Sequence, residues 1–188
     1  MIGPLSGPTP LMKQEYVDIV DKKGNELFKT TKTQAHKKGL LHKCVIAEVI
    51  DSKGKWALVV PRSHKQDAGQ LVSPVGGHVT SGESEIEALK REAFEEVGLK
   101  DFEFKFIARD IFNRSVLGRK ENHMFVVFEI YSNKDLILGD ETSEYKKFTK
   151  KEIKEKMKLD PKIFGDAFHF VYKNIYKQFK KTARFDIL

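Results

Sequence analysis

Hydrophobic and polar positions follow two different periods along the chain, and each period predicts a different kind of element. The apolar run Cys44 to Ile50, the turn Asp51-Ser-Lys-Gly54 and the apolar run Trp56 to Val60 predict two strands joined by a tight turn. Similar runs predict a short hairpin between Glu15 and Phe28, strands at 102–111 and 124–131, and a short strand within 140–148. A further apolar stretch lies at 71–75 and leads into Gly76-Gly77.

A helical period begins at Ser84, where Ser84 and Glu87 have the spacing of a capping box. The helix should end before Gly98, since glycine is the preferred residue just after a helix. Its apolar stripe is predicted to contain Ile86, Leu89, Ala93 and Val97.

Two further helices are predicted near the end of the chain. Thr149 is the expected cap of a short helix running through Met157, and a last helix follows Pro161. The last helix carries an apolar stripe at helical spacing, which favours core packing over a ligand site, formed by Phe164, Phe168, Val171, Ile175 and Phe179. With no internal repeat and no second core, we predict a flexible tail at 1–12 and one domain at 13–188.

The composition is that of a soluble globular protein, because 40% of the 188 residues are hydrophobic and 32% are charged. No apolar run approaches the ~20 residues of a membrane span. The first residues lack the basic start and apolar block of a secretory signal. The single cysteine, Cys44, cannot form an internal disulfide, so we expect a cytoplasmic protein.

A net charge of +7 favours anionic partners such as nucleotides, diphosphates or RNA. Much of the excess lies in lysines between 146 and 158. For these lysines a solvated helix face is favoured over a dedicated binding patch.

Three carboxylates lie on one face of the predicted helix, because Glu92, Glu95 and Glu96 are spaced at i, i+3 and i+4. Like charges at this spacing repel one another. A bound cation would relieve the repulsion, and hard divalent ions such as Mg²⁺ take oxygen ligands. The helix is therefore a candidate metal site.

The residues around these carboxylates resemble the Nudix box, G-x5-E-x7-R-E-U-x-E-E-x-G-U, where U is aliphatic. The match runs from Gly77 through Glu83 and Arg91-Glu92 to Gly98-Leu99, and every fixed letter is present. The first U is Ala93, smaller than usual, which suggests close packing. The resemblance implies an α/β (α+β) fold in which a mixed β-sheet is sandwiched between helices.

The resemblance also implies an activity, the hydrolysis of a nucleoside diphosphate linked to another moiety, with Mg²⁺ or Mn²⁺ as the cofactor. It implies that Arg91 orients a glutamate, that Glu83 supports the loop or holds metal through water, and that Glu95 or Glu96 is the general base. The implied metal ligands are Glu92, Glu95, Glu96 and the Gly77 carbonyl, with Glu121 and Glu144 as alternatives outside the box. Relatives in this family are often homodimers.

The flanks of the box are similar to the isopentenyl-diphosphate isomerase branch of the same superfamily. The matching residues are His36, His42, the Gly77-His78 pair and the Glu121-Asn122 pair, which in the isomerases include ligands of a second metal. Two departures argue against isomerase chemistry. Gly76 stands where the isomerases carry a catalytic cysteine, and His123 stands where they carry a second glutamate.

The histidines leave two interpretations open. His36, His42, His78 and His123 form a set suited to a transition metal, or a merely polar cluster. Two functions compete with hydrolysis of a small-molecule diphosphate: an isomerase of isoprenoid diphosphates and a non-catalytic nucleotide- or RNA-binding module, of which RNA binding is not favoured. Substrate recognition is expected from the loops at 61–70 and 114–120.

Overall fold

The structure is a computed structural model that describes residues 14–63 and 66–176. The predicted tail at 1–12 and Phe179 lie outside the described residues. The strands are β1 (Tyr16–Val20), β2 (Glu26–Thr31), β3 (His42–Ile50), β4 (Lys55–Pro61), β5 (Val75–His78), β6 (Glu103–Val116), β7 (Arg119–Tyr131) and β8 (Thr142–Thr149). The helices are α1 (Lys32–Lys38), α2 (Glu85–Val97), α3 (Lys150–Leu159) and α4 (Asp166–Val171), with a 3-10 turn at Pro161–Ile163 and a π-helical turn at Tyr172–Tyr176.

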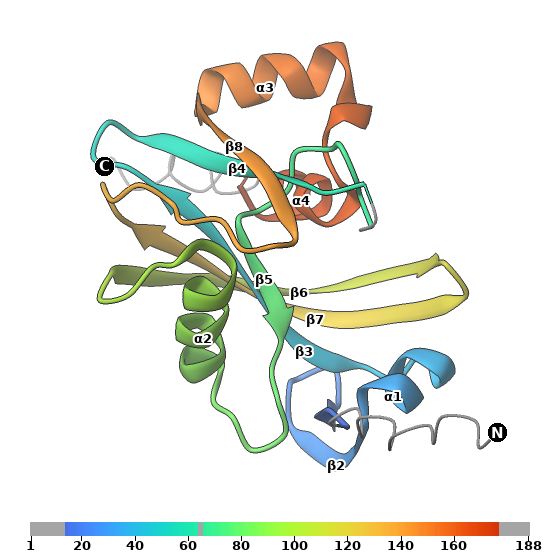
Figure 1. Cartoon of the computed structure of the whole chain (residues 1–188). Helices are drawn as coiled ribbons and strands as arrows, with labels where there is room; N and C mark the ends of the chain where they lie inside the picture. Colours follow the sequence, from blue (N-terminus) through green and yellow to red (C-terminus); the bar gives the residue numbers. More distant parts are fainter. Residues whose placement is uncertain (1–13, 64–65, 177–188) are drawn as a thin grey trace, which may run out of the picture.

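Strand β3 is the hub of one mixed sheet (Figure 1). It pairs in parallel with β7 over its whole length, from His42 opposite His123 to Ile50 opposite Tyr131. Its antiparallel neighbours are β1, β4 and β5, while β8 pairs with β4 and β6 pairs with β7. A long β6–β7 hairpin reaches away from the sheet (Figure 1).

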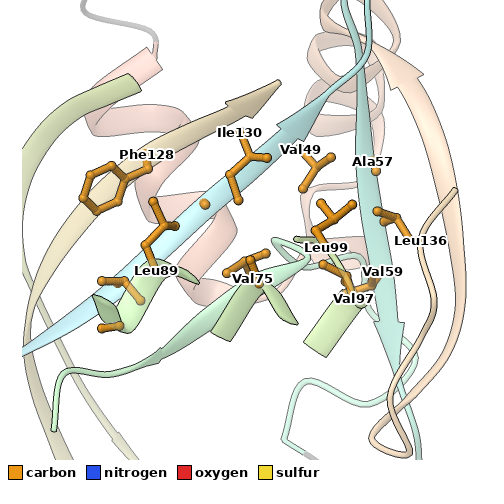
Figure 2. Close-up of a cluster of buried hydrophobic side chains, with 14 of the residues drawn as sticks. Val49, Ala57, Val59, Val75, Leu89, Val97, Leu99, Phe128, Ile130 and Leu136 are labelled. Carbon is orange, nitrogen blue, oxygen red and sulfur yellow. The ribbon is translucent and has the colours of Figure 1, made fainter. Parts of the chain in front are cut away.

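Alternating residues of β3 face two different cores, because successive side chains of a strand point to opposite faces. Val45, Ala47 and Val49 pack in the larger core beneath α2, together with Leu89 and the other side chains drawn in Figure 2. Cys44 and Ile46 pack on the other face against Val171 and Ile175, in a second cluster. The sheet is therefore sandwiched between helices, as the sequence predicted.

Several elements differ from the sequence-based expectation. Helix α1 was not predicted; its short seven-residue span contains only two buried residues, too few for a visible hydrophobic period. Within the apolar stretch at 71–75 only Val75 belongs to a named strand, β5 (Val75–His78), which the sequence did not predict. Ile86 is 45% exposed and lies outside the α2 core stripe, where Ala88 is buried in its place. The stripe begins two positions later than predicted because the first turn of the helix faces solvent.

The end of the described chain is more broken than predicted. Instead of one helix after Pro161, a 3-10 turn, α4 and a π-helical turn follow one another. Phe168, Val171 and Ile175 are nevertheless buried, so the predicted stripe does form core. Cys44 is a buried free thiol, also as predicted. Within the described ranges no helix is both long enough and apolar enough to cross a membrane.

Candidate functional site

Helix α2 begins and ends where local chemistry requires it. The Ser84 side chain accepts from the Glu87 backbone N–H at 3.2 Å, and the Glu87 carboxylate accepts from the Ser84 N–H at 2.8 Å. This reciprocal capping box satisfies two of the first-turn donors. Gly98 ends the helix with a φ of 67°, a left-handed conformation that glycine adopts without strain. The box carboxylates are thus presented by a helix with both ends fixed.

Arg91 holds three of the carboxylates together. Its Nε and Nη2 donate to the two oxygens of Glu83 at 2.8 and 2.9 Å, which makes a bidentate pair. Its Nη1 donates to Glu92 at 2.6 Å and to Glu95 at 3.3 Å. One guanidinium therefore faces three carboxylates, and the cluster keeps an excess of negative charge that a divalent cation would balance.

Gly77 leaves the space that Glu92 occupies. A Cβ atom at position 77 would lie 1.9 Å from Oε1 of Glu92, closer than any real contact. The Glu92 carboxylate therefore packs directly against the β5 backbone and is only 8% exposed. The pKa of Glu92 is raised, mainly by burial and further by the nearby carboxylates Glu95 and Glu83. The hydrogen bond from Arg91 and its positive charge oppose this rise. A cation bound nearby would therefore stabilise the ionised form of this carboxylate.

The remaining box glutamates differ in surroundings. Glu95 is exposed and Glu96 is partly buried. Burial opposes the ionisation of Glu83, yet its hydrogen bonds to Arg91 and Thr80 outweigh this and leave its pKa lowered. Glu144 lies on β8 opposite Val60, about half exposed, and it forms an ion pair with Lys146 on the same strand at 2.8 Å. Its role as a metal ligand stays a prediction.

Four histidines converge on the other face of the sheet, from α1, β3, β5 and β7. One ligand nitrogen from each of His36, His42, His78 and His123 lies within 4.8 Å of the others. The Nε2 atom of His36 is 3.1 Å from Nε2 of His78 and 3.2 Å from Nε2 of His123. The sequence-predicted cluster is therefore formed in space.

All four imidazoles favour the neutral form. Burial is the largest cause in each case and lowers the pKa of His42 to about 4 and that of His123 to about 2, while the pKa values of His36 and His78 are also lowered. Neutral imidazole is the form that binds metals.

The tautomer of His42 is fixed by its neighbour. Its Nδ1 is 2.7 Å from the Leu40 carbonyl, which can only accept, so Nδ1 carries the proton. Its Nε2 is left as a buried acceptor without a hydrogen-bond partner. A carbonyl that fixes the imidazole tautomer in this way is a common second partner of metal-binding histidines, and the donor set therefore fits a transition metal.

Glu121 joins the histidine cluster rather than the box. It is 7% exposed, and its charge acts on His36 and His42. Arg114 Nε donates to it at 2.6 Å, and Arg119 lies 3.5 Å from it. Sequence reasoning did not single out these two arginines. The available signal was their position in the β6–β7 hairpin, where Arg114 falls opposite Glu121.

The two sites meet at adjacent residues of β5. Gly77 faces α2 and Glu92, whereas the side chain of His78 points into the histidine cluster. The His78 carbonyl also accepts a hydrogen bond from Arg91 Nη2 at 2.9 Å. A displacement of β5 would therefore change the geometry of both sites.

Comparisons with known proteins match this domain to a protein family. The model of the NUDIX domain family matches residues 40–168. An uncharacterized Nudix hydrolase of Yersinia pestis is 37% identical over 92 residues, 48% of this chain and 50% of that protein. Isopentenyl-diphosphate Delta-isomerase 2 of Photorhabdus laumondii is 30% identical over 137 residues, 70% of this chain and 76% of that protein.

The fold is also that of solved structures. A crystal structure from Deinococcus radiodurans superposes with a TM-score of 0.67 at 20% identity, covering 85% of this chain and 98% of that one. The chain spans about half the length of the first curated relatives that it matches, 50% and 56%. Because the family model matches well over half of the chain and includes the whole carboxylate box, the protein belongs to the Nudix family.

Proposed function

We propose that the protein is a Mg²⁺- or Mn²⁺-dependent hydrolase of the diphosphate bond in a nucleoside diphosphate linked to another moiety. The observation that carries the proposal is the packing of Glu83, Glu92 and Glu95 around the single cation Arg91. The metal ligands in this proposal are Glu92, Glu95, Glu96 and the Gly77 carbonyl, with Glu144 as an alternative. A bound divalent ion would neutralise the diphosphate and make its phosphorus open to attack.

The chain's own residues have distinct tasks in this reaction. Arg91 fixes the carboxylates of Glu83 and Glu92 in place. Either Glu95 or Glu96 takes the proton of the attacking water, since both belong to the exposed or partly exposed part of the box. Glu83 supports the loop before α2, where it also accepts from the Thr80 N–H at 2.9 Å.

We further propose that the histidine cluster holds a transition metal as a structural site. The orphaned Nε2 of His42 and the close approach of three other Nε2 atoms support this. In a tetrahedral site with metal–nitrogen bonds of about 2.1 Å, neighbouring nitrogens lie about 3.4 Å apart. Such an ion would tie α1 to β3, β5 and β7.

Isomerisation of an isoprenoid diphosphate is a second candidate, favoured by the similarity to the Photorhabdus laumondii isomerase. Gly76 argues against it, because β5 offers no thiol on the face that carries His78. Incorporation of deuterium from solvent into isopentenyl diphosphate would reveal isomerase activity, and we expect none. We also propose a cytoplasmic location and a small-molecule substrate. RNA binding and a homodimer stay predictions from charge and family.

The test of the hydrolase proposal is an activity screen with Mg²⁺ and with Mn²⁺. The panel includes nucleoside di- and triphosphates, nucleotide sugars, dinucleoside polyphosphates and isoprenyl diphosphates. We expect divalent-dependent release of phosphate or nucleoside monophosphate from at least one nucleotide. No turnover anywhere in the panel would contradict the proposal.

A further inference from the structure

The loop between β5 and α2, residues 79–84, holds Glu83 opposite Arg91 without a helix or strand of its own. Part of this loop is fixed from within. The Thr80 N–H donates to the Glu83 carboxylate at 2.9 Å, and the Glu83 N–H donates to the Thr80 carbonyl at 2.8 Å. Gly82, the third residue of the turn, has a φ of 82°, which glycine adopts without strain. These bonds shape the turn, but they do not fix its position relative to the sheet.

A carboxylate of strand β1 holds this turn against the sheet. Asp18 accepts from the Ser81 hydroxyl at 2.7 Å with Oδ1 and from the Gly82 N–H at 3.0 Å with Oδ2. The Ser81 N–H also donates to the Tyr16 carbonyl at 2.9 Å. Figure 1 shows the loop reaching from α2 toward the β1–β2 hairpin. Both oxygens of Asp18 are therefore used on the two central residues of the turn.

Strand β1 is anchored independently of Asp18. The side chains of Val17 and Ile19 are 1% and 4% exposed and belong to a small hydrophobic core. The Val20 N–H donates to the Leu41 carbonyl at 2.9 Å, just before β3 begins. Loss of the Asp18 carboxylate should therefore leave β1 in place and release only the turn.

The turn leads directly into the carboxylate box. Gly82 is followed by Glu83, which accepts from Nε and Nη2 of Arg91 at 2.8 and 2.9 Å. The remaining guanidinium nitrogen, Nη1, donates to Glu92 at 2.6 Å. A connected series of contacts thus runs from β1 through the turn and Arg91 to a proposed metal ligand. Strand β1 precedes residues 40–168, so the part of the chain that matches the family model does not contain it.

We propose that Asp18 is a positioning residue for the carboxylate site. By holding the Ser81-Gly82 turn on β1, it sets the position of Glu83 and Arg91, and thereby the geometry in which the box binds a divalent ion. The consequence for turnover rests on the proposed hydrolase function. Loss of a group that orients metal ligands typically costs about 10–100-fold in metal affinity or activity. Because Asp18 acts through the turn and Arg91, the lower end of this range is expected.

Hydrogen exchange measured by NMR tests the geometry without a substrate. In Asp18→Ala the Gly82 amide should exchange at least ~10-fold faster than in the parent, the range for a lost hydrogen bond to a charged group. Amides inside α2 and β3 should keep their exchange rates. Asp18→Asn is the conservative variant, because its amide can accept from the Gly82 N–H and donate to the Ser81 hydroxyl. It should keep most of the protection.

Mg²⁺ binding and turnover measure the consequence at the box. Isothermal titration with Mg²⁺ alone should give ~10-fold weaker binding in Asp18→Ala. On the best substrate of the diphosphate screen, kcat at saturating Mg²⁺ should fall by ~10-fold or more, because a small displacement of positioned groups is costly at a reactive centre. The KM of the substrate should change less than kcat. Asp18→Asn should recover most of each loss.

Two further variants separate positioning from general stability. Glu15→Ala removes another carboxylate next to β1, one that pairs with Lys32 at 2.5 Å rather than with the turn. It should match the parent in exchange, Mg²⁺ affinity and kcat. Ser81→Ala removes one of the two Asp18 bonds from the loop side, so a result is obtained even if Asp18→Ala fails to fold. Combined with Asp18→Ala it should add nothing further, because both side chains act through the same contact.

The proposal is overturned if Asp18→Ala leaves the Gly82 amide as protected as in the parent, or if that amide is released while Mg²⁺ affinity and kcat stay at their parent values. It is also overturned if the parent binds no Mg²⁺, or if Glu15→Ala reproduces the losses. Faster exchange throughout α2 and β3 would make Asp18 a contributor to overall stability instead. If the parent hydrolyses no diphosphate, the hydrolase function fails, while exchange and the Mg²⁺ titration still decide the role of Asp18.

Discussion

The two faces of the central sheet carry different kinds of polar cluster. On the α2 face, Glu83, Glu92 and Glu95 form ion pairs with Arg91. On the other face, His36, His42 and His123 are buried and His78 is half-buried. All four favour the neutral form, and they come from four separate elements. The first arrangement suits a hard ion that exchanges with substrate, and the second suits a tightly held softer ion.

The two sites nevertheless share one short strand. Gly77 and His78 are neighbours in β5, and strand geometry sends one toward each face. A strand of four residues can thus position two chemically unlike clusters at once. A substitution at one face should therefore affect that cluster and leave the other unchanged.

Among substitutions outside the carboxylates themselves, the largest effect is expected from Gly77→Ala. The added Cβ would lie 1.9 Å from the Glu92 carboxylate, which must move. Because a displacement of about 1 Å at a reactive centre can cost 10²-fold, we expect kcat to fall by ~10²-fold or more. The matched control is Gly76→Ala, whose Cβ would meet only the Val45 carbonyl at 3.8 Å. Equal losses of kcat in both variants would contradict the view that position 77 must lack a Cβ to make room for Glu92.

The next effect concerns the histidine face. If the cluster holds a structural ion, removal of that ion by EDTA should lower the Tm by about 6–12 °C, the shift for a ligand worth ~3 kcal/mol in a domain of this size. His42→Ala should lose the bound metal, measured by elemental analysis, and should no longer respond to EDTA. His169→Ala, on α4 outside the cluster, is the control. A purified protein without stoichiometric metal and without a chelator response would make the cluster merely polar.

A smaller loss is expected from Arg91→Lys. Lysine keeps the charge but cannot make the bidentate contact with Glu83 while also reaching Glu92. We expect kcat to fall by about 10–30-fold, with bound transition metal unchanged, because Arg91 touches the histidine face only through the His78 carbonyl. Arg109→Lys, which changes a surface pair with Glu85, should be nearly silent. Loss of metal from the histidines in Arg91→Lys would show that the faces are not separable.

The smallest predicted effect concerns a buried carboxyl on the histidine-bearing face. Glu48 is fully buried, with Ser73 Oγ donating to it at 2.7 Å, and burial raises its pKa to about 8. Its folded-state pKa lies above the ordinary value of 4.5, so the stability it contributes is present below pH 4.5 and is lost as the pH rises through 8. Glu48→Gln should therefore exceed the parent in free energy of unfolding by at least ~1 kcal/mol at pH 9.

Urea unfolding at pH 5, 7 and 9 measures this difference. The advantage of the Glu48→Gln variant should shrink toward pH 5, where the parent carboxyl is protonated in the folded state. A difference that does not depend on pH would mean that Glu48 is ionised when buried.

The sequence predicted more of the carboxylate site than of the histidine face. Glu92, Glu95 and Glu96 lie on one helix, so their spacing alone places Glu92 and Glu95 together. The histidines come from four elements far apart in sequence, and their proximity depends on the parallel pairing that sets His42 beside His123. Resemblance to a family suggested the set, while residue spacing could not.

Other features could not be read from the sequence for physical reasons. The role of Gly77 depends on how closely α2 packs on β5, a tertiary distance. Arg114 looked like a loop residue, but its strand continues to Val116, and the turn is only Leu117-Gly118. The chain after Pro161 breaks into short turns that a single helical period does not describe.

The most direct test of the account is the rate of diphosphate hydrolysis as a function of Mg²⁺ concentration, for the parent and for Glu96→Gln. On the best substrate of the screen, the parent rate should rise from near zero to saturation with Mg²⁺, and the variant should lose nearly all turnover, at least ~10³-fold, while keeping its histidine-bound metal and its Tm. A parent rate that does not depend on the divalent ion, or a variant with unimpaired turnover, would contradict the assignment of the chemistry to the α2 face.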